Sequence, residues 1–265
     1  MQNGEKDNKS ELVTDQVRGW DLAARTEESA MTYEAYFGGK SWCREEFFES
    51  GGMDVRTSIA EFLRDTNFPP AGKRALDIGC GIGRVTAALA DIFDEVYGVD
   101  FSDNMIETAT ALHKDKPNLH FAANNGLDLS LFDDNSFDFC LAYFVFIHIP
   151  RFEVIASYIR EIDRVLKPGG LYMFNINTHK WVIKVFGKIP MHYRVRDLLS
   201  KIGLWDYMSK LETKNLAKAL RVYYTSPKKL GEILESTTLE TIRITSRSDE
   251  YTCYYGRKNP ATRLY

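Results

Sequence analysis

The sequence contains few cysteines, and their spacing fits neither a disulfide framework nor a metal site. Cys43, Cys80, Cys140 and Cys253 are widely separated, and no CxxC pair or Cys/His cluster occurs. A zinc module needs such pairs, and a disulfide-stapled fold is a short chain dense in cysteine. We therefore expect reduced thiols, a cytoplasmic protein and no bound metal.

Long apolar runs and a basic excess are also missing. The longest apolar run covers residues 139–147, whereas a membrane-spanning helix needs roughly 20 apolar residues. The polar N-terminal stretch lacks the apolar core of a signal peptide. With 34 Lys and Arg against 37 Asp and Glu, the net charge is -3, without the positive excess that phosphate-backbone binding requires. We expect no membrane span and no nucleic-acid partner.

From residue 74 onward, short apolar runs alternate with amphipathic stretches, which is the pattern of βα units that build a parallel sheet. Ser102 is the expected N-cap of one helix, and Pro150 the first-turn proline of another. The predicted strands are 74–78, 95–100, 119–123, 137–144 and 171–177, and the predicted helices 84–92, 103–113 and 151–165.

Two last strand-like runs, 239–247 and 251–257, are close enough in sequence to pair antiparallel. The predicted fold class is therefore α/β: a Rossmann-like, doubly wound, mostly parallel seven-stranded sheet with an antiparallel last strand. A helical N-terminal cap and a lid insertion are expected in addition, because two segments do not belong to the βα repeat.

The cap contains helical runs at 14–24, 42–50 and 55–65 and is rich in aromatic residues. The lid lies between the fifth strand and a late helix that begins near Thr225. We expect a single domain over residues 1–265. Its predicted parts are a polar tail (1–13), the cap (14–70), a cofactor-binding core (71–177), the lid (178–224) and the last helix and strands (225–265).

A glycine-rich turn follows the first predicted strand, in the segment ALDIGCGIGR that ends at Arg84. Its spacing is G-x-G-x-G, whereas the dinucleotide signature is G-x-G-x-x-G. Asp77 would repel a pyrophosphate, but its carboxylate can accept a hydrogen bond from an ammonium group. Asp100 ends the second strand, where a carboxylate can accept hydrogen bonds from both ribose hydroxyls. The pattern favours a nucleoside joined to an amino acid over a dinucleotide.

With these residues in place, the sequence resembles the class I S-adenosylmethionine-dependent methyltransferases, in particular those that act on small molecules. The strand motif LDIGCGIG carries the resemblance. The ribose-binding turn VDFS, the SFD that opens the fourth strand and the turn VLKPGGL before the fifth follow in the family's order. The resemblance covers residues 74–177 well and the cap and lid poorly.

The resemblance implies S-adenosylmethionine as cofactor and S-adenosylhomocysteine as product. Asp77 and the loop backbone would hold the methionine portion, and Asp100 the ribose. Phe101 and Met105 would flank the adenine, although a plain core role fits both equally. The family's acidic residue near the adenine amine is absent, which leaves Asn125 or Gly126, with Asp128 third. The predicted cofactor site comprises Asp77, Gly79, Cys80, Gly81, Asp100, Phe101, Met105, Asn125, Gly126, Leu127 and Tyr143.

Methyl transfer from a sulfonium is an in-line displacement, so the enzyme must align the acceptor, exclude water and remove a proton where the acceptor carries one. The candidate catalytic residues follow the fourth strand. His148 can accept a proton near neutral pH, and Tyr143 can orient the acceptor. The alternatives are that His148 only holds its loop through a hydrogen bond and that Tyr143 only packs.

The expected partner is a small-molecule methyl acceptor. The aromatic cap favours an aromatic metabolite, as in specialised metabolism, whereas basic residues of the lid favour an anionic one. Lys180, Lys184 and Lys188 equally fit a solvated helix face. The methylated atom and the oligomeric state stay open. The candidate substrate-binding residues are Tyr33, Trp42, Phe144, Asn177, His192 and Tyr193.

Two other function classes compete with this interpretation. An NAD-dependent Rossmann oxidoreductase would explain the glycines and Asp100, but the glycine spacing and Asp77 oppose it. A non-catalytic module that binds S-adenosylmethionine as a scaffold or regulator would show a damaged cofactor loop or no pocket cover. The loop is intact, and the cap and lid supply a cover.

Overall fold

The computed structural model describes residues 43–178, 223–247 and 251–260, together with Trp20, Ala24 and Met31. Seven strands form one sheet in the order β3-β2-β1-β4-β5-β7-β6. All neighbours pair parallel except β7, which runs antiparallel to both β5 and β6. This confirms the predicted sheet. The strands are β1 (Arg74–Ile78), β2 (Glu95–Asp100), β3 (Leu119–Ala123), β4 (Phe137–Ala142), β5 (Leu166–Ile176), β6 (Leu239–Arg247) and β7 (Tyr251–Lys258).

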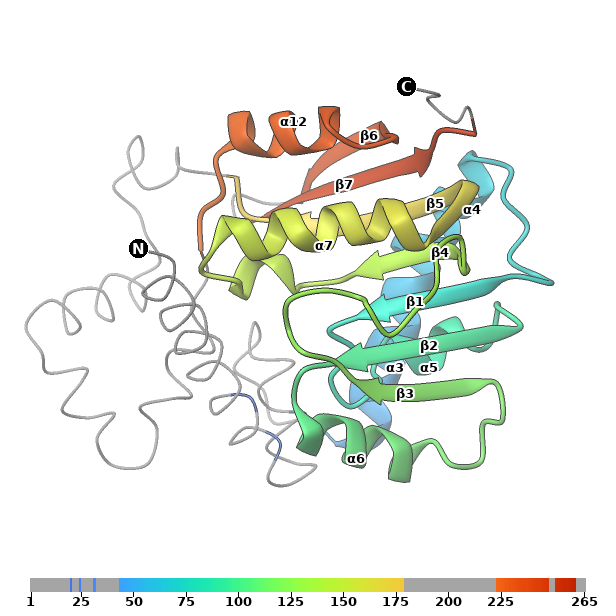
Figure 1. Cartoon of the computed structure of the whole chain (residues 1–265). Helices are drawn as coiled ribbons and strands as arrows, with labels where there is room; N and C mark the ends of the chain where they lie inside the picture. Colours follow the sequence, from blue (N-terminus) through green and yellow to red (C-terminus); the bar gives the residue numbers. More distant parts are fainter. Residues whose placement is uncertain are drawn as a thin grey trace, which may run out of the picture.

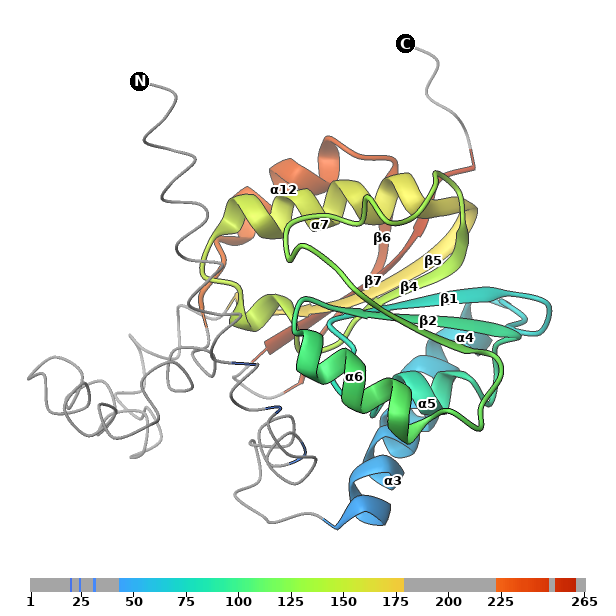
Figure 2. The same ribbon diagram turned by 60° about the horizontal axis from the view of Figure 1, so that its bottom comes forward.

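Helices cover both faces of this sheet. Helices α7 (Phe152–Val165) and α12 (Pro227–Glu235) lie on one face, and α3 (Arg44–Asp54), α4 (Ala60–Asp65) and α5 (Thr86–Leu89) on the other (Figures 1 and 2). Helix α6 (Asp103–Leu112) connects β2 to β3. The carboxyl ends of the parallel strands share one edge of the sheet, at the left in Figure 1. Ligands of open α/β sheets bind outside this edge.

The first helical stretch differs from the prediction. We expected separate helices at 42–50 and 55–65, but α3, the π-helical turn η2 (Val55–Ile59) and α4 follow one another without a break. Gly51 and Gly52 suggest an interruption in the sequence. In the structure, a Cβ on Gly51 would lie 2.1 Å from the carbonyl oxygen of Arg84. Gly51 therefore serves close packing of α3 on the glycine loop, and does not end the helix.

Strand boundaries around β4 and β5 also differ from the prediction. Strand β4 ends at Ala142, two residues early, because Phe144 has φ 60° and cannot continue an extended strand. Strand β5 begins at Leu166, before the Pro168-Gly169 turn. Phe137 pairs with Leu166 and Phe139 with Leu171, so the turn is accommodated as a large bulge beside β4.

The helix termini follow simple capping rules. The Ser102 hydroxyl caps α6 by accepting a hydrogen bond from the Met105 amide, as predicted. Pro227 occupies the first turn of α12. Arg151 is the N-cap of α7, so Pro150 lies just before the helix and not in its first turn. Helix α5 has only four residues, shorter than the predicted 84–92, because the residues at both of its ends also form i→i+3 hydrogen bonds, such as those from the Ala88 amide to Val85 and from the Ile92 amide to Leu89.

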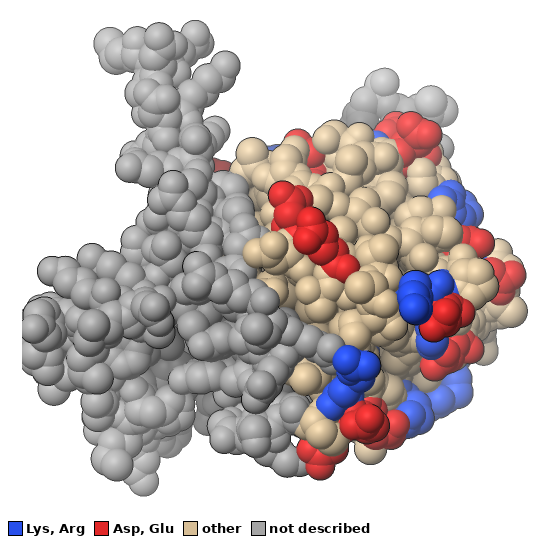
Figure 3. Space-filling model, turned by 90° about the horizontal axis from the view of Figure 1, so that it is seen from below, with Lys and Arg blue, Asp and Glu red and all other residues tan. Residues whose placement is uncertain are grey.

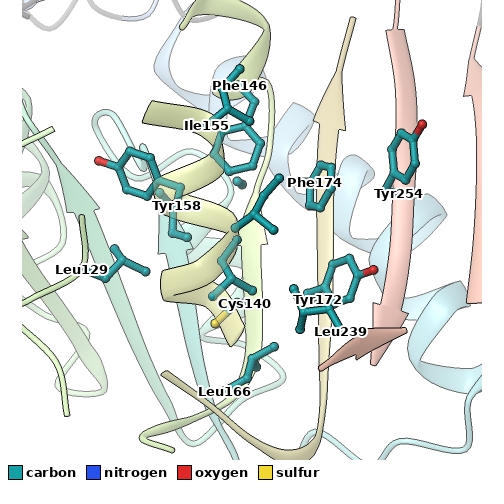
Figure 4. Close-up of a cluster of buried hydrophobic side chains, with 14 of the residues drawn as sticks. Leu129, Cys140, Phe146, Ile155, Tyr158, Leu166, Tyr172, Phe174, Leu239 and Tyr254 are labelled. Carbon is teal, nitrogen blue, oxygen red and sulfur yellow. The ribbon is translucent and has the colours of Figure 1, made fainter. Parts of the chain in front are cut away.

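The larger core lies between the sheet and helices α7 and α12 (Figure 4). Ile155, Tyr158, Ile159 and Ile162 form the buried stripe of α7, with the spacing of one helix face. On the sheet, Phe174 stacks between Tyr172 and Tyr254, with ring centroids 5.7 and 5.4 Å apart. Each fully buried ring contributes roughly 1.5–3 kcal/mol by apolar burial, so this face anchors β5, the strand beside the candidate site.

Opposite charges are interspersed on the surface of the described residues. Ion pairs such as Lys116–Asp91 at 2.7 Å and Arg164–Asp134 at 2.8 Å link them. Figure 3 shows blue and red side chains side by side along one side of the face seen from below, and a separate acidic strip within the tan area. Among the described residues, none of the helices is long and apolar enough to span a membrane.

Candidate cofactor and methyl-transfer site

The glycine loop after β1 has a backbone that only glycine adopts easily. Gly79, Gly81 and Gly83 all have positive φ, at 69°, 54° and 89°. The amides of Gly79 and Cys80 both donate to the carbonyl oxygen of Val99, at 2.7 and 3.0 Å. The loop is thus fastened to the end of β2, and Gly81 and Gly83 are buried in it.

Asp100, the last residue of β2, lies directly against this loop. One carboxylate oxygen accepts a hydrogen bond from the Gly81 amide at 3.1 Å, and the other accepts one from the Ser102 amide at 3.0 Å. The residue is 9% exposed. Its backbone oxygen accepts a bond from the Asn124 amide at 2.9 Å, which ties in the end of β3. These bonds orient a carboxylate between the first two loops at the carboxyl edge.

Asp77 lies in β1 and is 3% exposed. The Thr86 hydroxyl of α5 donates to its carboxylate at 2.7 Å. Burial raises the pKa of the Asp77 carboxyl from 3.8 to about 7, and the Thr86 hydrogen bond opposes this shift. A cationic ligand group beside Asp77 would favour the charged form, so binding of an ammonium group and ionisation of this carboxyl are coupled.

This shift predicts a pH-dependent stability that Asp77→Asn removes. The pKa of Asp77 is near 4 in the unfolded chain and about 7 in the folded protein. Between these two pH values the folded protein holds the proton and the unfolded chain has released it. The unfolding free energy therefore falls as pH rises through this window, by at most about 1.4 kcal/mol per pH unit. Urea unfolding of ligand-free protein at pH 5 and 7.5 measures the difference.

The matched control is Asp91→Asn, which neutralises an exposed carboxylate shortly after α5. It should keep the pH profile of the wild type. Parallel profiles for the wild type and Asp77→Asn would show that Asp77 ionises normally in the fold.

Two asparagines build the loop after β3. The Asn125 carbonyl oxygen accepts bonds from the amides of Leu127 and Asp128 at 2.8 and 3.0 Å, and its NH2 group donates to the Asp128 carboxylate at 2.8 Å. Asn124 accepts a bond from the Gly126 amide and donates to the Tyr158 hydroxyl, both at 3.1 Å. The predicted Asn125 and Gly126 therefore lie in one compact turn that is anchored to α7.

The two residues predicted to flank the adenine are placed differently from each other. Met105 is 1% exposed and packs in a small core with Phe47 and Ile82. Phe101 follows β2 and is half-buried. Cys80 is buried within the loop, and its thiol lies 3.5 Å from the Gly81 carbonyl oxygen. Met105 thus packs in this core and Phe101 lies at the carboxyl edge, and their role beside the adenine stays a prediction.

Tyr143, directly after β4, joins a polar cluster that the sequence did not reveal. Its hydroxyl donates to the Asp54 carboxylate of α3 at 3.2 Å. The other Asp54 oxygen lies 2.8 Å from the Arg84 guanidinium, which also donates to Ser50 at 3.1 Å. Burial raises the pKa of the Tyr143 phenol well above its usual value, and the Asp54 charge adds to this. Tyr143 is therefore a neutral hydrogen-bond donor at physiological pH.

The next residue, Phe144, has a left-handed backbone and half-buried aromatic surroundings. Its ring makes edge-on contacts with Tyr143 and Tyr251, at centroid distances of 4.6 and 4.7 Å. Its amide donates to the side-chain oxygen of Asn175 on β5 at 2.8 Å. Asn175 is fully buried, and its NH2 group donates to the Cys253 sulfur at 3.1 Å.

His148 ends the short 3-10 helix η3 (Phe146–His148) and is half-buried. Its ring lies edge-on to Trp20, with centroids 5.6 Å apart. The segment from Tyr223 to Thr225 passes beside it, because the amide of Tyr223 donates to Ile147 and that of Thr225 to Asn177, both at 2.7 Å. Asn177 and His148 thus lie along the same strip of the carboxyl edge.

Four of the predicted substrate residues, Tyr33, Trp42, His192 and Tyr193, lie outside the described residues, as do the lid lysines. In the described ranges, no group of three or more His, Cys, Asp or Glu side chains is arranged to hold a metal ion. Asp54 belongs to no motif that the sequence analysis identified, and Thr86 was included only as part of a predicted helix. Asp54 became visible through its contacts with Tyr143 and Arg84, 89 and 30 positions away, and Thr86 through its hydrogen bond to Asp77.

The arrangement fits a nucleoside that carries an amino-acid end. Three left-handed glycines shape the loop after β1, an oriented carboxylate ends β2, and a second carboxylate lies in β1 just before the loop. A methyltransferase-domain family model matches residues 76–174, which is the segment that builds this edge. The chain belongs to the class I S-adenosylmethionine-dependent methyltransferases and is a methyltransferase. This assignment excludes the oxidoreductase and the non-catalytic scaffold that the sequence left as alternatives.

Its relatives include demethylmenaquinone methyltransferases. That of Staphylococcus haemolyticus is 30% identical over 178 residues, which cover 66% of this chain and 72% of the relative. That of Staphylococcus aureus is 37% identical over 125 residues, covering 46% and 50%, so the chain spans about half the length of this relative.

Solved structures share the fold at low identity. Magnesium protoporphyrin IX methyltransferase from Synechocystis, with bound S-adenosylhomocysteine, has a TM-score of 0.54 and 18% identity, covering 86% of this chain and 93% of that one. An Aquifex aeolicus S-adenosylmethionine-dependent methyltransferase has a TM-score of 0.51 and 17% identity, covering 77% and 92%.

Proposed function

We propose that the protein transfers the methyl group of S-adenosylmethionine to an aromatic small molecule by direct in-line displacement. The observation that carries this proposal is the strip of aromatic side chains that follows β4. The Phe144 ring contacts the rings of Tyr143 and of Tyr251, which begins β7. Farther along the same edge, the Trp20 ring contacts His148. Flat rings pack well edge-on or offset against such side chains. An aromatic acceptor therefore fits this edge better than a nucleic acid or a peptide backbone.

The cofactor end of the site uses the residues that line the first three loops. When bound, S-adenosylmethionine supplies an electrophilic methyl group on its sulfonium. The Asp100 carboxylate would accept hydrogen bonds from the ribose hydroxyls, and Asp77 would hold the methionine ammonium. The 125–127 turn would hold the adenine end. The left-handed backbone around Gly79 and Gly81 would hold the methionine portion.

The acceptor end uses the turn after β4 and the 3-10 helix. Phe144 and Tyr143 exclude water from the transfer position, and the neutral Tyr143 hydroxyl holds Asp54 without competing for a proton. His148 removes a proton from an acceptor that must lose one. We propose further that the cap (14–70) and lid (178–224) belong to the same domain as the cofactor-binding core. The relatives are named after demethylmenaquinone, so this compound, in its reduced form demethylmenaquinol, is the first acceptor to test.

The role of His148 predicts a selective loss of rate. His148→Gln keeps a side chain that can hydrogen bond but cannot act as a base near neutral pH. We expect it to lower the rate of S-adenosylhomocysteine formation with a short-chain demethylmenaquinol by about 100-fold, the usual contribution of a general base. The dissociation constant for S-adenosylhomocysteine, measured by calorimetry, should stay within twofold of the wild type.

His120→Gln is the matched control, because His120 pairs with Glu95 at the surface of β2 and β3. It should retain the full rate. A full rate in His148→Gln would assign His148 to holding its loop. If the wild type binds S-adenosylhomocysteine but turns over no demethylmenaquinol, the proposed acceptor is wrong, and other aromatic acceptors are then screened by release of the same product.

A further inference from the structure

Phe144 is a strained residue at the centre of the candidate site. Its φ of 60° is unusual for a bulky side chain. Such conformations persist only where the surrounding structure enforces them, and they gather at functional sites. The question is therefore which group enforces this one, and what the enforced turn supports.

Asn175 enforces it. This residue lies in β5, between β4 and β7, and is 0% exposed. Its side-chain oxygen accepts the hydrogen bond from the Phe144 amide at 2.8 Å. Its NH2 group donates to Cys253 of β7 at 3.1 Å, which fixes the orientation of the amide. Strand β5 thus holds the Asn175 oxygen in a fixed position, within hydrogen-bond distance of the amide of the left-handed Phe144.

The enforced turn contacts the glycine loop from two sides. After Phe144, Val145 packs so closely on Gly79 that a Cβ there would lie 2.5 Å from Val145 Cγ2. Before Phe144, the Tyr143 hydroxyl donates to Asp54, which pairs with Arg84 immediately after Gly83. A shift of the turn would therefore move contacts at both ends of the loop that runs from Gly79 to Gly83.

We propose that Asn175 is a positioning residue of the cofactor site: by holding Phe144 in its left-handed conformation, it presses the 143–145 turn against the glycine loop and sets the affinity for the cofactor. The inference rests on the cofactor site proposed above. Asn175 itself touches neither cofactor nor acceptor in this role. It acts through the turn, as the supporting shell of a preorganised site does.

The experiment measures binding of S-adenosylhomocysteine by calorimetry, which needs no acceptor. Asn175→Ala is expected to weaken binding about tenfold, because a small displacement of a preorganised loop has effects of this size or larger. Phe144→Gly removes the backbone strain, since glycine adopts φ 60° freely. In the Phe144→Gly background, Asn175→Ala should therefore weaken binding less than twofold. If Asn175→Ala does not fold, Asn175→Ser replaces it in both backgrounds.

Tyr172→Phe is the matched control. Tyr172 lies on the same strand, is equally buried, and loses only its 3.0 Å hydrogen bond to Thr241. It should lower the melting temperature and leave the affinity within twofold of the wild type. An unchanged affinity in Asn175→Ala, or a tenfold loss that persists in the Phe144→Gly background, would overturn the inference. A wild type that does not bind S-adenosylhomocysteine would instead overturn the proposed cofactor site, and the inference with it.

Discussion

Asp100→Ala is expected to lose most of the thermal stabilisation that S-adenosylhomocysteine gives the wild-type protein. A hydrogen bond to a charged acceptor contributes about 1.5–3 kcal/mol, and the Asp100 carboxylate is proposed to accept one from each ribose hydroxyl. The variant also loses the acceptors that hold the Gly81 and Ser102 amides. Together these losses should weaken binding by at least about 100-fold, since each 1.4 kcal/mol is a factor of ten.

The size of the expected change makes the measurement simple. At a ligand concentration 100 times the wild-type dissociation constant, binding adds about 2.7 kcal/mol to the unfolding free energy. In a variant that binds 100-fold more weakly, the same concentration adds only about 0.4 kcal/mol. Thermal unfolding with and without S-adenosylhomocysteine separates these values, and NAD at the same concentration serves as a ligand that should have no effect.

Two further variants locate the effect at this carboxylate. Asp103→Ala removes an exposed acidic residue from the first turn of α6, three positions away, and should keep the full stabilisation. Asp100→Asn keeps the shape but has one acceptor oxygen in place of two, and should fall between Asp100→Ala and the wild type. If Asp100→Ala were stabilised as strongly as the wild type, the ribose would have to bind elsewhere.

The sheet was predictable because local signals and the global fold agree. Strands β1, β2 and β3 have the predicted bounds, since each is a short run rich in apolar residues and ends at glycine, asparagine or an acidic residue. The N-cap role of Ser102 is equally local. Agreement of this kind between levels is what allows a sequence to specify one fold.

The supporting residues of the site were not predictable, because they depend on contacts between distant segments. Asp54 meets Tyr143 across 89 positions, and Asn175 meets Cys253 across 78. No local pattern marks either pair. The left-handed Phe144 is a similar case: its local sequence favours a longer strand, and the Asn175 side chain that accepts its amide hydrogen bond lies 31 positions away. Sequence thus identified the groups proposed to face the ligand, but not those that hold them.

Gly79→Ala should damage the cofactor loop through two separable effects. The first is the backbone, because φ 69° costs a residue with a Cβ about 1–2 kcal/mol. The second is overpacking, because the new Cβ would lie 2.5 and 2.9 Å from the two Val145 methyl groups. Overpacking of this kind costs about 1–3 kcal/mol. Urea unfolding should therefore show a loss of about 2–5 kcal/mol, with binding of S-adenosylhomocysteine weakened as well.

The chain offers a control for each effect. Gly72 has nearly the same φ, 73°, but a Cβ there would meet nothing within 4 Å. Gly72→Ala should therefore show the backbone cost alone, with normal affinity for S-adenosylhomocysteine. Val145→Ala should destabilise the wild type by removing buried methyl groups but stabilise Gly79→Ala by relieving the overlap. This reversal of sign identifies the contact between the turn after β4 and the glycine loop. Equal losses in Gly72→Ala and Gly79→Ala, with Val145→Ala additive to both, would mean that the two segments do not press on each other.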